Sequence, residues 1–268
     1  MFSVLMSVYF KENPLYLDAA LNSIFEQTIL AGEVVLVQDG ALSDELYDVI
    51  DTWKRKLNIV DVVLPCNVGL GPALNKGLEV CKYEFVARMD TDDISLPHRF
   101  KTQLDFLVSN GCDVCGSWVS EFDTDPKIIS FVKKVPFSDS KIRKFATRRN
   151  PMNHPSVFYR KSQVVQCGGY ENVPYFEDYH LWLKMMSYGN SFFNIQDVLV
   201  NMRAGIGQLK RRSGISYAKC EFSFFFISLK AGYISMGDFV FNVCSRIPIR
   251  LLPKIIVSKF YSLSRNKF

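Results

Sequence analysis

Three carboxylates fall within four residues of this 268-residue chain, at Asp90, Asp92 and Asp93. Like charges this close repel one another, so the grouping costs stability unless a cation or hydrogen-bond donors compensate. Carboxylate oxygens on a tight turn suit a hard divalent ion such as Mn²⁺ or Mg²⁺. Taken alone, the pattern favours a solvated turn that caps the helix expected near Pro97. The surrounding sequence has to decide between a metal site and a capping turn.

A second acidic pair, Glu177 and Asp178, stands at the start of a strongly apolar helical pattern. The positive end of the helix dipole favours the ionised form of a carboxylate there. An ionised carboxylate in a cleft can act as a general base. Acids in a first helical turn also serve simply as caps, but the metal-like cluster upstream favours catalysis for this pair.

Apolar strand-like runs alternate with amphipathic helical patterns along the first 120 residues. Helices are expected from Pro14, after Ser43, from Pro72 and near Pro97. The strand-like runs cover residues 2–9, 33–38, 59–64, 85–89 and 113–119. This alternation predicts an α/β fold, with a mainly parallel, Rossmann-like sheet that carries helices on both faces.

Asp39 directly follows the second run, and Asp90 follows the fourth. Ligands of such sheets bind outside the carboxyl ends of the strands, so both acids are expected at one edge. After residue 120 the pattern is less regular. It predicts a helix or loop over 137–149, a strand entered through a turn over 153–159, and a helix from Glu177.

The net charge of +5 hides an asymmetry between the two ends of the chain. Residues 203–268 carry twelve Lys and Arg but only Glu221 and Asp238, which gives +10, whereas residues 1–202 carry −5. The basic tail is also rich in Phe, Leu and Ile. No nucleic-acid motif accompanies it, so nucleic acid is not an expected partner. The spacing fits either an amphipathic helix on an anionic membrane surface or a packed helical cap with a solvated basic face.

The remaining composition excludes several classes of protein. With 48% hydrophobic and 22% charged residues, the chain is neither disordered nor fibrous. No apolar stretch is long enough to span a membrane, and the N-terminus looks like a strand rather than a signal peptide. Seven cysteines suggest reduced thiols in the cytosol, and Cys112 and Cys115 are interpreted as buried strand thiols, not a zinc site.

An ordered series of motifs gives these features a common meaning. VLVQDG ends at Gly40, ARMDTDD ends at Asp93, NHPS begins at Asn153, and EDYHLWL begins at Glu177. The chain resembles the family 2 inverting glycosyltransferases of the GT-A fold, and among them the bacterial enzymes that build O-antigen and exopolysaccharide repeating units. The matching segments are 3–9, 23–28, 35–40, 67–70, 73–78, 87–93, 96–100, 153–156 and 177–183.

The resemblance implies a role for each acidic residue. Asp39 corresponds to the residue that contacts the uracil of a UDP-sugar. Asp92 corresponds to the ligand of Mn²⁺ or Mg²⁺, with Asp90 beside it near the ribose and sugar. Asp178 corresponds to the catalytic base, and Glu177 is expected to position the acceptor. Asp93, Asn67 and Arg88 are placed around the donor in the same way.

The resemblance also implies a reaction. The enzyme would move a hexose from a UDP-sugar to a sugar on undecaprenyl diphosphate, such as N-acetylglucosamine. Galactose is slightly favoured over glucose as the hexose. It would work as a peripheral protein at the cytoplasmic face of the bacterial inner membrane. Residues 1–202 would form the catalytic domain, with a nucleotide-sugar half at 1–120 and an acceptor half at 121–202. Residues 203–268 would form the membrane-contacting tail.

Two other functions compete with this one. A nucleotidyltransferase that makes sugar nucleotides would need a glycine-rich basic loop after the first strand, and the sequence after Val8 has no glycine before Pro14. A non-catalytic sugar-nucleotide-binding protein would lose nothing on Asp178→Asn.

The histidines and some arginines carry weaker signals. His98 is placed near the donor or metal, His154 near the acceptor or diphosphate, and His180 in a structural position. Arg203 and the pair Arg211 and Arg212 are candidates for gripping phosphates, with an ordinary basic loop as the alternative.

Overall fold

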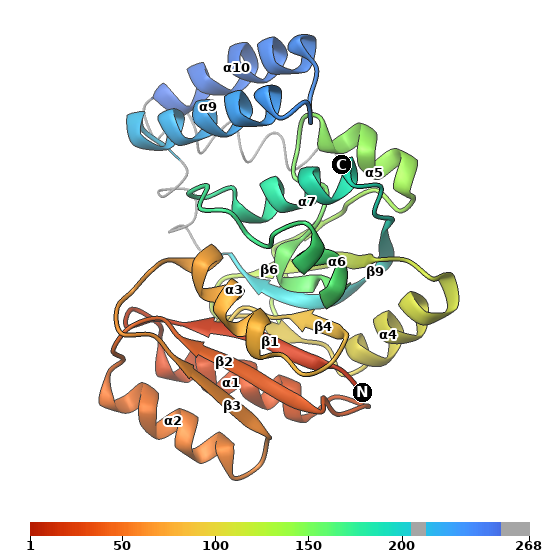
Figure 1. Cartoon of the computed structure of the whole chain (residues 1–268). Helices are drawn as coiled ribbons and strands as arrows, with labels where there is room; N and C mark the ends of the chain where they lie inside the picture. Colours follow the sequence, from red (N-terminus) through yellow and green to blue (C-terminus); the bar gives the residue numbers. More distant parts are fainter. Residues whose placement is uncertain (205–212, 253–268) are drawn as a thin grey trace.

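The computed structural model describes residues 1–204 and 213–252. Its N-terminal half is built on four parallel strands in the order β3-β2-β1-β4, which confirms the strand-like runs of the sequence (Figure 1). β1 pairs in parallel with both β2 and β4. The bounds are β1 Ser3–Val8, β2 Glu33–Gln38, β3 Ile59–Val63 and β4 Phe85–Arg88. β2 is buried along its whole length, as expected for a parallel strand covered on both faces.

Beyond β4 the sheet becomes mixed. β8 runs antiparallel to both β4 and β6, and β6 and β9 are parallel neighbours. The short β5 and β7 pair antiparallel with β9 and β6. The bounds are β5 Ile94–Ser95, β6 Val114–Phe122, β7 Phe131–Lys133, β8 Phe158–Arg160 and β9 Phe192–Arg203. The predicted α/β fold is therefore confirmed, and β9 is an addition that the sequence did not predict.

Two apolar cores cover the two faces of the sheet. Alternate side chains of a strand point to opposite faces, so Leu5 enters one core while Val4 and Met6 enter the other. The core around Leu5 contains α3 (Leu70–Val80), α5 (Asp139–Ala146), α6 (Lys161–Gln166) and α7 (Glu177–Ser187). The other contains α1 (Pro14–Phe25), α2 (Asp44–Lys54) and α4 (Arg99–Asn110).

The helix starts follow local chemistry. Asn13 Oδ1 accepts the Leu15 N–H at 2.9 Å, and Pro14 opens α1, as predicted. α7 begins at Glu177, also as predicted. α4 begins at Arg99, near Pro97 as predicted, with His98 as its N-cap residue.

The C-terminal part forms a helical hairpin, α9 (Ile215–Lys230) and α10 (Met236–Leu251). It packs on α7 through aromatic contacts, among them Phe224 stacked on Phe176 with ring centroids 4.7 Å apart. None of the helices within the described residues is both long and apolar enough to cross a bilayer.

Two arginines of the hairpin face inward rather than toward a surface. Glu221 is fully buried and accepts hydrogen bonds from Arg246 Nε at 2.7 Å and from Arg250 Nε at 2.8 Å. Both arginines belong to the basic tail for which the sequence predicts a membrane-facing or solvated surface, and for these two that prediction is wrong because they neutralise a buried acid.

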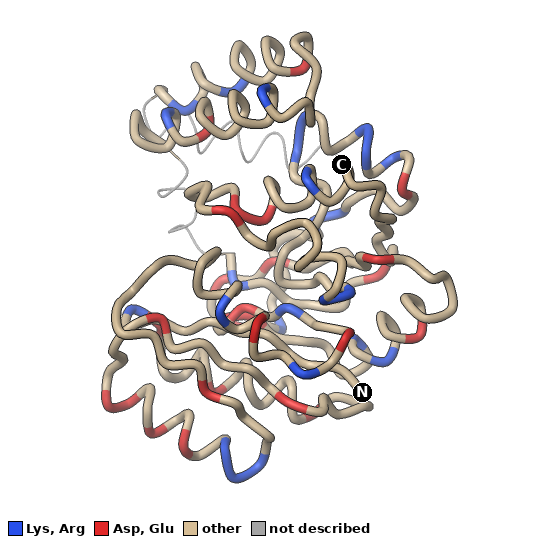
Figure 2. The backbone as a smooth tube through the Cα atoms, viewed as in Figure 1, with Lys and Arg blue, Asp and Glu red and all other residues tan. Residues whose placement is uncertain are grey.

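The charges are distributed unevenly over the fold. Figure 2 shows acidic residues along α2 and basic residues on α5 and on the hairpin. The free cysteines include Cys112 and Cys115, both buried near the start of β6, as the sequence predicted.

Candidate active site

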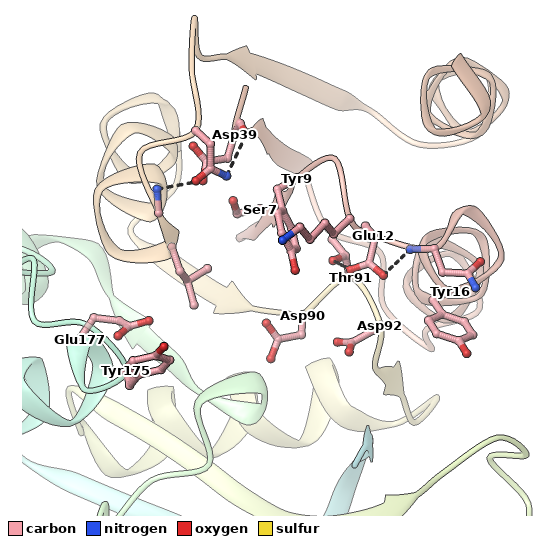
Figure 3. Close-up of a pocket in the computed structure, with 15 residues that line it drawn as sticks. Ser7, Tyr9, Glu12, Tyr16, Asp39, Asp90, Thr91, Asp92, Tyr175 and Glu177 are labelled. Carbon is pink, nitrogen blue, oxygen red and sulfur yellow. Dashed lines mark hydrogen bonds between the residues drawn. The ribbon is translucent and has the colours of Figure 1, made fainter. Parts of the chain in front are cut away.

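A cavity of about 630 Å³ opens at the carboxyl ends of β1, β2 and β4. Asp39 and Asp90 both line it, because β1 lies between the two strands that they follow. The predicted common edge is therefore present (Figure 3). The lining residues are Ser7, Tyr9, Lys11, Glu12, Asn13, Tyr16, Asp39, Asn67, Gly69, Leu70, Asp90, Thr91, Asp92, Tyr175 and Glu177.

Asp39 shapes the loop that leads into α3. Its two carboxylate oxygens accept the backbone N–H groups of Val68 at 2.7 Å and Gly69 at 3.1 Å. Asn67 Nδ2 donates to the Asp39 carbonyl at 3.3 Å. Gly40 has φ 87°, and a side chain there would press on the Asn67 backbone, so a glycine suits this close approach. Asp39 and Asn67 therefore form one wall of the cavity together.

The acidic cluster forms the opposite part of the site. Oxygens of Asp90, Asp92 and Asp93 lie within 4.8 Å of one another. Burial, together with the neighbouring charges of Asp90 and Glu12, raises the pKa of Asp92 to about 7. Burial and the neighbouring charges of Asp90 and Asp92 raise the pKa of Asp93 well above its usual range. Asp90 and Asp92 line the cavity, whereas Asp93 is buried behind them.

The end of β9 holds this cluster in place. The Arg203 N–H donates to Asp93 Oδ1 at 2.7 Å, and the Arg203 Nε donates to the Asp92 carbonyl at 3.2 Å. The guanidinium lies 3.7 Å from the centroid of the Tyr16 ring. The structure thus gives Arg203 a supporting role beneath the loop. Arg211 and Arg212, the other candidates for phosphate contact, lie outside the described residues.

Arg88 supports the cluster from the sheet. The side chain is only 1% exposed and forms an ion pair with Asp90, and Nε and Nη1 have no hydrogen-bond partner within residues 1–204 and 213–252. The Arg88 carbonyl accepts the Arg99 Nη2 at 2.6 Å. Arg88 is not among the lining residues, and its ion pair with Asp90 links it to the cavity, so its expected place around the donor stays a prediction.

The acidic cluster fits a hard divalent cation. It offers carboxylate oxygens only, which such ions prefer. Asp93 Oδ2 is buried and lacks a hydrogen-bond partner in the described part of the chain. The raised pKa of Asp92 indicates a need for positive charge that Arg88 alone does not meet.

The second acidic pair lies at the start of α7. Glu177 lines the cavity, and burial with the charge of Asp178 raises the pKa of Glu177 to about 7. Asp178 is half-buried and is not among the lining residues. Its Oδ2 accepts the Asn150 Nδ2 at 2.6 Å, and its Oδ1 accepts the Tyr179 N–H at 2.7 Å. Burial raises the pKa of Asp178, and these hydrogen bonds oppose that rise.

The three histidines have different surroundings. His154 Nε2 lies 3.1 Å from Tyr170 Oη, and burial lowers the His154 pKa well below its usual value. His180 is buried beside Tyr233, in agreement with its predicted structural position. His98 is exposed just before α4 and is not among the lining residues, so its place near the donor or metal stays a prediction.

Glu12 and Tyr175 are among the lining residues that the sequence did not predict for the site. Glu12 Oε2 accepts the Thr91 hydroxyl at 2.5 Å and lies near Asp92. Because Glu12 follows the first strand, the rule that located Asp39 could have located it as well. Tyr175 had no comparable signal, since its place depends on an unusual backbone conformation.

Comparison with known proteins gives concordant results. The model of the family described as "Glycosyl transferase family 2" matches residues 3–169. The chain is 46% identical over 268 residues to the UDP-Gal:alpha-D-GlcNAc-diphosphoundecaprenol beta-1,3-galactosyltransferase of Escherichia coli, covering 100% of this chain and 97% of the relative. It is 42% identical to the amylovoran biosynthesis glycosyltransferase AmsE of Erwinia amylovora, covering 99% of this chain and 100% of that one.

Solved structures share the fold at lower identity. The mannosyltransferase PcManGT from Pyrobaculum calidifontis, in complex with GDP-Man and Mn²⁺, has a TM-score of 0.68 at 16% identity, over 98% of this chain and 75% of that one. S. aureus TarS 1-349, in complex with UDP-GlcNAc, has a TM-score of 0.67 at 19% identity, over 90% of this chain and 70% of that one.

Proposed function

We propose that this chain, which belongs to glycosyl transferase family 2, transfers galactose from UDP-galactose to a sugar held on a lipid diphosphate. The observation that carries the proposal is a cavity lined both by a metal-fitting acidic cluster and by Glu177, the first residue of the acidic pair on α7. The full-length identity with the Escherichia coli galactosyltransferase supports the choice of donor and of an N-acetylglucosamine-diphospho-undecaprenol acceptor.

The donor would lie between the two walls of the cavity. Asp39 would contact the uracil, Asn67 would lie beside the donor, and the diphosphate would lie toward Asp90 and Asp92. A Mn²⁺ or Mg²⁺ ion on Asp92 and Asp90 would neutralise the charge of the departing diphosphate. Asp93, Arg88 and Arg203 hold these carboxylates in position.

The acceptor hydroxyl would attack from the side of α7. In a single displacement, its oxygen forms a bond to the anomeric carbon while the bond from that carbon to the diphosphate breaks, and UDP leaves. Asp178 takes the hydroxyl proton. Asn150 keeps the Asp178 carboxylate oriented and favours its ionised form. Glu177, which lines the cavity directly, positions the acceptor.

Family membership decides against the two competing functions. A nucleotidyltransferase that makes sugar nucleotides forms a phosphoanhydride bond between a sugar phosphate and a nucleotide rather than a glycosidic bond, and this chain is a glycosyltransferase. A purely binding protein would need neither an ionisable pair beside the cavity nor a raised pKa at Glu177.

The protein would work at the cytoplasmic surface of the bacterial inner membrane. Support comes from the exposed apolar side chains of Phe222, Phe226 and Val240 on α9 and α10. Phe222 and Phe226 stack with centroids 6.3 Å apart, and Lys230 lies 4.7 Å from the Phe226 ring. Aromatic rings flanked by lysine suit the interface of an anionic bilayer. Such contact would place the enzyme beside a lipid-linked acceptor.

A donor panel tests the function. The full chain is incubated with each of several UDP-sugars and with N-acetylglucosamine linked through diphosphate to a short alkyl chain, and NMR determines the product linkage. We expect transfer from UDP-galactose with inversion. Asp178→Asn should lower turnover at least ~100-fold while UDP binding stays close to wild type. If Asp178→Asn turns over normally and Glu177→Gln does not, the base is Glu177.

A further inference from the structure

Tyr175 has a backbone conformation that side chains rarely adopt. Its φ is 69°, and it is the single non-glycine residue with positive φ in the described ranges 1–204 and 213–252. A bulky residue in this region is strained and persists only where the surroundings enforce it. Strained residues of this kind cluster at functional sites, so the Tyr175 side chain is a candidate for a functional role.

Aromatic contacts with α9 enforce the conformation. The Tyr175 ring lies 5.2 Å from the Tyr217 ring, which is buried, and the next residue, Phe176, stacks on Phe224. Arg250, fixed by the buried Glu221, lies 4.9 Å from the centroid of the Tyr217 ring. The hairpin therefore supports the segment that carries Tyr175 and continues into Glu177.

The Tyr175 ring remains largely open to the cavity. The residue is 54% exposed although it is packed on Tyr217, and it lines the cavity together with Glu177 (Figure 3). Tyr175 comes two residues before Glu177, the first residue of the acidic pair of α7. In Figure 3 it lies apart from Asp39. An exposed, pre-positioned aromatic face at this place can cover the apolar C–H face of a sugar ring.

We propose that Tyr175 is a platform for the acceptor sugar, binding the C–H face of its pyranose ring while the acidic pair of α7 engages its hydroxyl. The proposal rests on the proposed function, because it takes the acceptor to be a sugar. It also assigns a task to the helical hairpin: through Tyr217, α9 holds the acceptor platform in place.

The test separates the ring from the backbone. Tyr175→Gly tolerates the positive φ but removes the ring, and Tyr175→Asn does so while keeping a Cβ atom. With UDP-galactose and the short-chain acceptor, both variants should raise the acceptor KM roughly 10-fold. Calorimetry with UDP should give a Kd within about twofold of wild type. Tyr175→Phe, which keeps a ring, should restore most of the acceptor affinity.

Tyr188→Ala is the matched control, because Tyr188 is equally exposed but lies at the far end of α7 and does not line the cavity. An unchanged acceptor KM in Tyr175→Gly and Tyr175→Asn, with active wild type, would overturn the platform alone. A rise in the UDP Kd with unchanged acceptor KM would assign the ring to the donor and also overturn it. If wild-type protein neither binds the acceptor in calorimetry nor transfers to it, the proposed function and the platform both fail.

Discussion

The Asn150 amide donates a hydrogen bond to Asp178 Oδ2 at 2.6 Å and so joins the segment after α5 to the start of α7. Residues 28 positions apart in the chain are brought together at the proposed base. The bond stabilises the ionised carboxylate against the burial that raises its pKa. Asn150 is therefore expected to tune the base without touching the substrate.

Replacing Asn150 should change the pH dependence of the reaction. In Asn150→Ala the Asp178 pKa should rise further, because the ionised form loses a donor. The acidic limb of kcat/KM should then move to higher pH, so that turnover is depressed on the acidic side of the profile and recovers as the pH rises. The pH profile measures this shift. Asn110→Ala, on the exposed end of α4, should leave the profile as it is, and an unmoved limb in Asn150→Ala would show that Asp178 does not set it.

Removing the divalent cation should abolish transfer. We expect no activity in EDTA and recovery with Mn²⁺ or Mg²⁺, and Asp92→Asn should lose at least ~100-fold in turnover with its fold intact. Full activity in EDTA would contradict the metal site.

The same carboxylate should make the metal-free protein depend on pH. The folded pKa of Asp92 is about 7 against an ordinary 3.8, so between these values the folded state binds more protons than the unfolded state. The contribution of Asp92 to the free energy of unfolding therefore falls as the pH rises through this window. Asp92→Asn should melt higher than wild type in EDTA at pH 8, and the difference should shrink at pH 5. A variant that melts lower at pH 8 would show that the aspartate is not strained.

Glu221 should be essential for the stability of the hairpin. Glu221→Gln leaves Arg246 and Arg250 without their buried counter-charge, so the free energy of unfolding should fall by about 3–5 kcal/mol. Burial alone would raise the Glu221 pKa, but the two guanidiniums hold it below its ordinary 4.5. The stabilisation is thus present above that value and is lost as the pH falls through the folded pKa. Denaturant melts should show a large difference in the free energy of unfolding between wild type and Glu221→Gln at pH 7, and a small difference at pH 3.

The control for that experiment is an exposed ion pair. Glu79→Gln removes the partner of Lys76 on the surface of α3, and we expect a change within ~0.5 kcal/mol. Equal effects of the two variants would contradict the role of burial.

The exposed rings of α9 should mediate attachment to a bilayer. Wild type should co-sediment with anionic vesicles at low salt and be partly released at high salt, because salt screens the basic residues. Phe222→Ser with Phe226→Ser should weaken sedimentation severalfold while sparing transfer to the short-chain acceptor. Leu15→Ser with Val108→Ser removes apolar side chains elsewhere that are more exposed than the two phenylalanines, and this variant should sediment like wild type. Equal sedimentation of all three proteins would place the contact outside α9.

The first half of the fold was readable because its strands are short apolar runs bounded by polar turns. Such runs predicted β1 to β4, and the strand-end rule then brought Asp39 and Asp90 to one edge. β9 escaped prediction because its residues mix Asn, Gln and Asp with apolar side chains, and its pairing with β6 is irregular around Trp118. That pattern acquires meaning only from a neighbour far away in the chain.

The sequence predicted the residue types of the site but not which side chains line the cavity and which support those side chains. The basic tail has a composition that suggests anion binding. Three of its arginines nevertheless donate to groups of the protein itself: Arg203 to a backbone carbonyl, and Arg246 and Arg250 to a buried carboxylate. Tyr175 is an ordinary tyrosine in the sequence, and only its φ and its contact with Tyr217 distinguish it. Long-range partners and backbone strain do not show in local patterns.

The anchoring of Asp93 by Arg203 also bears on how the enzyme is made. The two residues are 110 positions apart, and β5, which follows the acidic turn, pairs only with β9 among the described strands. A growing chain emerges from the ribosome N-terminus first, so the acidic turn exists long before the strand that organises it. Sugar-nucleotide chemistry would thus be acquired at a late step of assembly, when β9 closes the sheet. A truncated chain released before β9 is made would contain the acidic motif but would lack the strand that holds it in place.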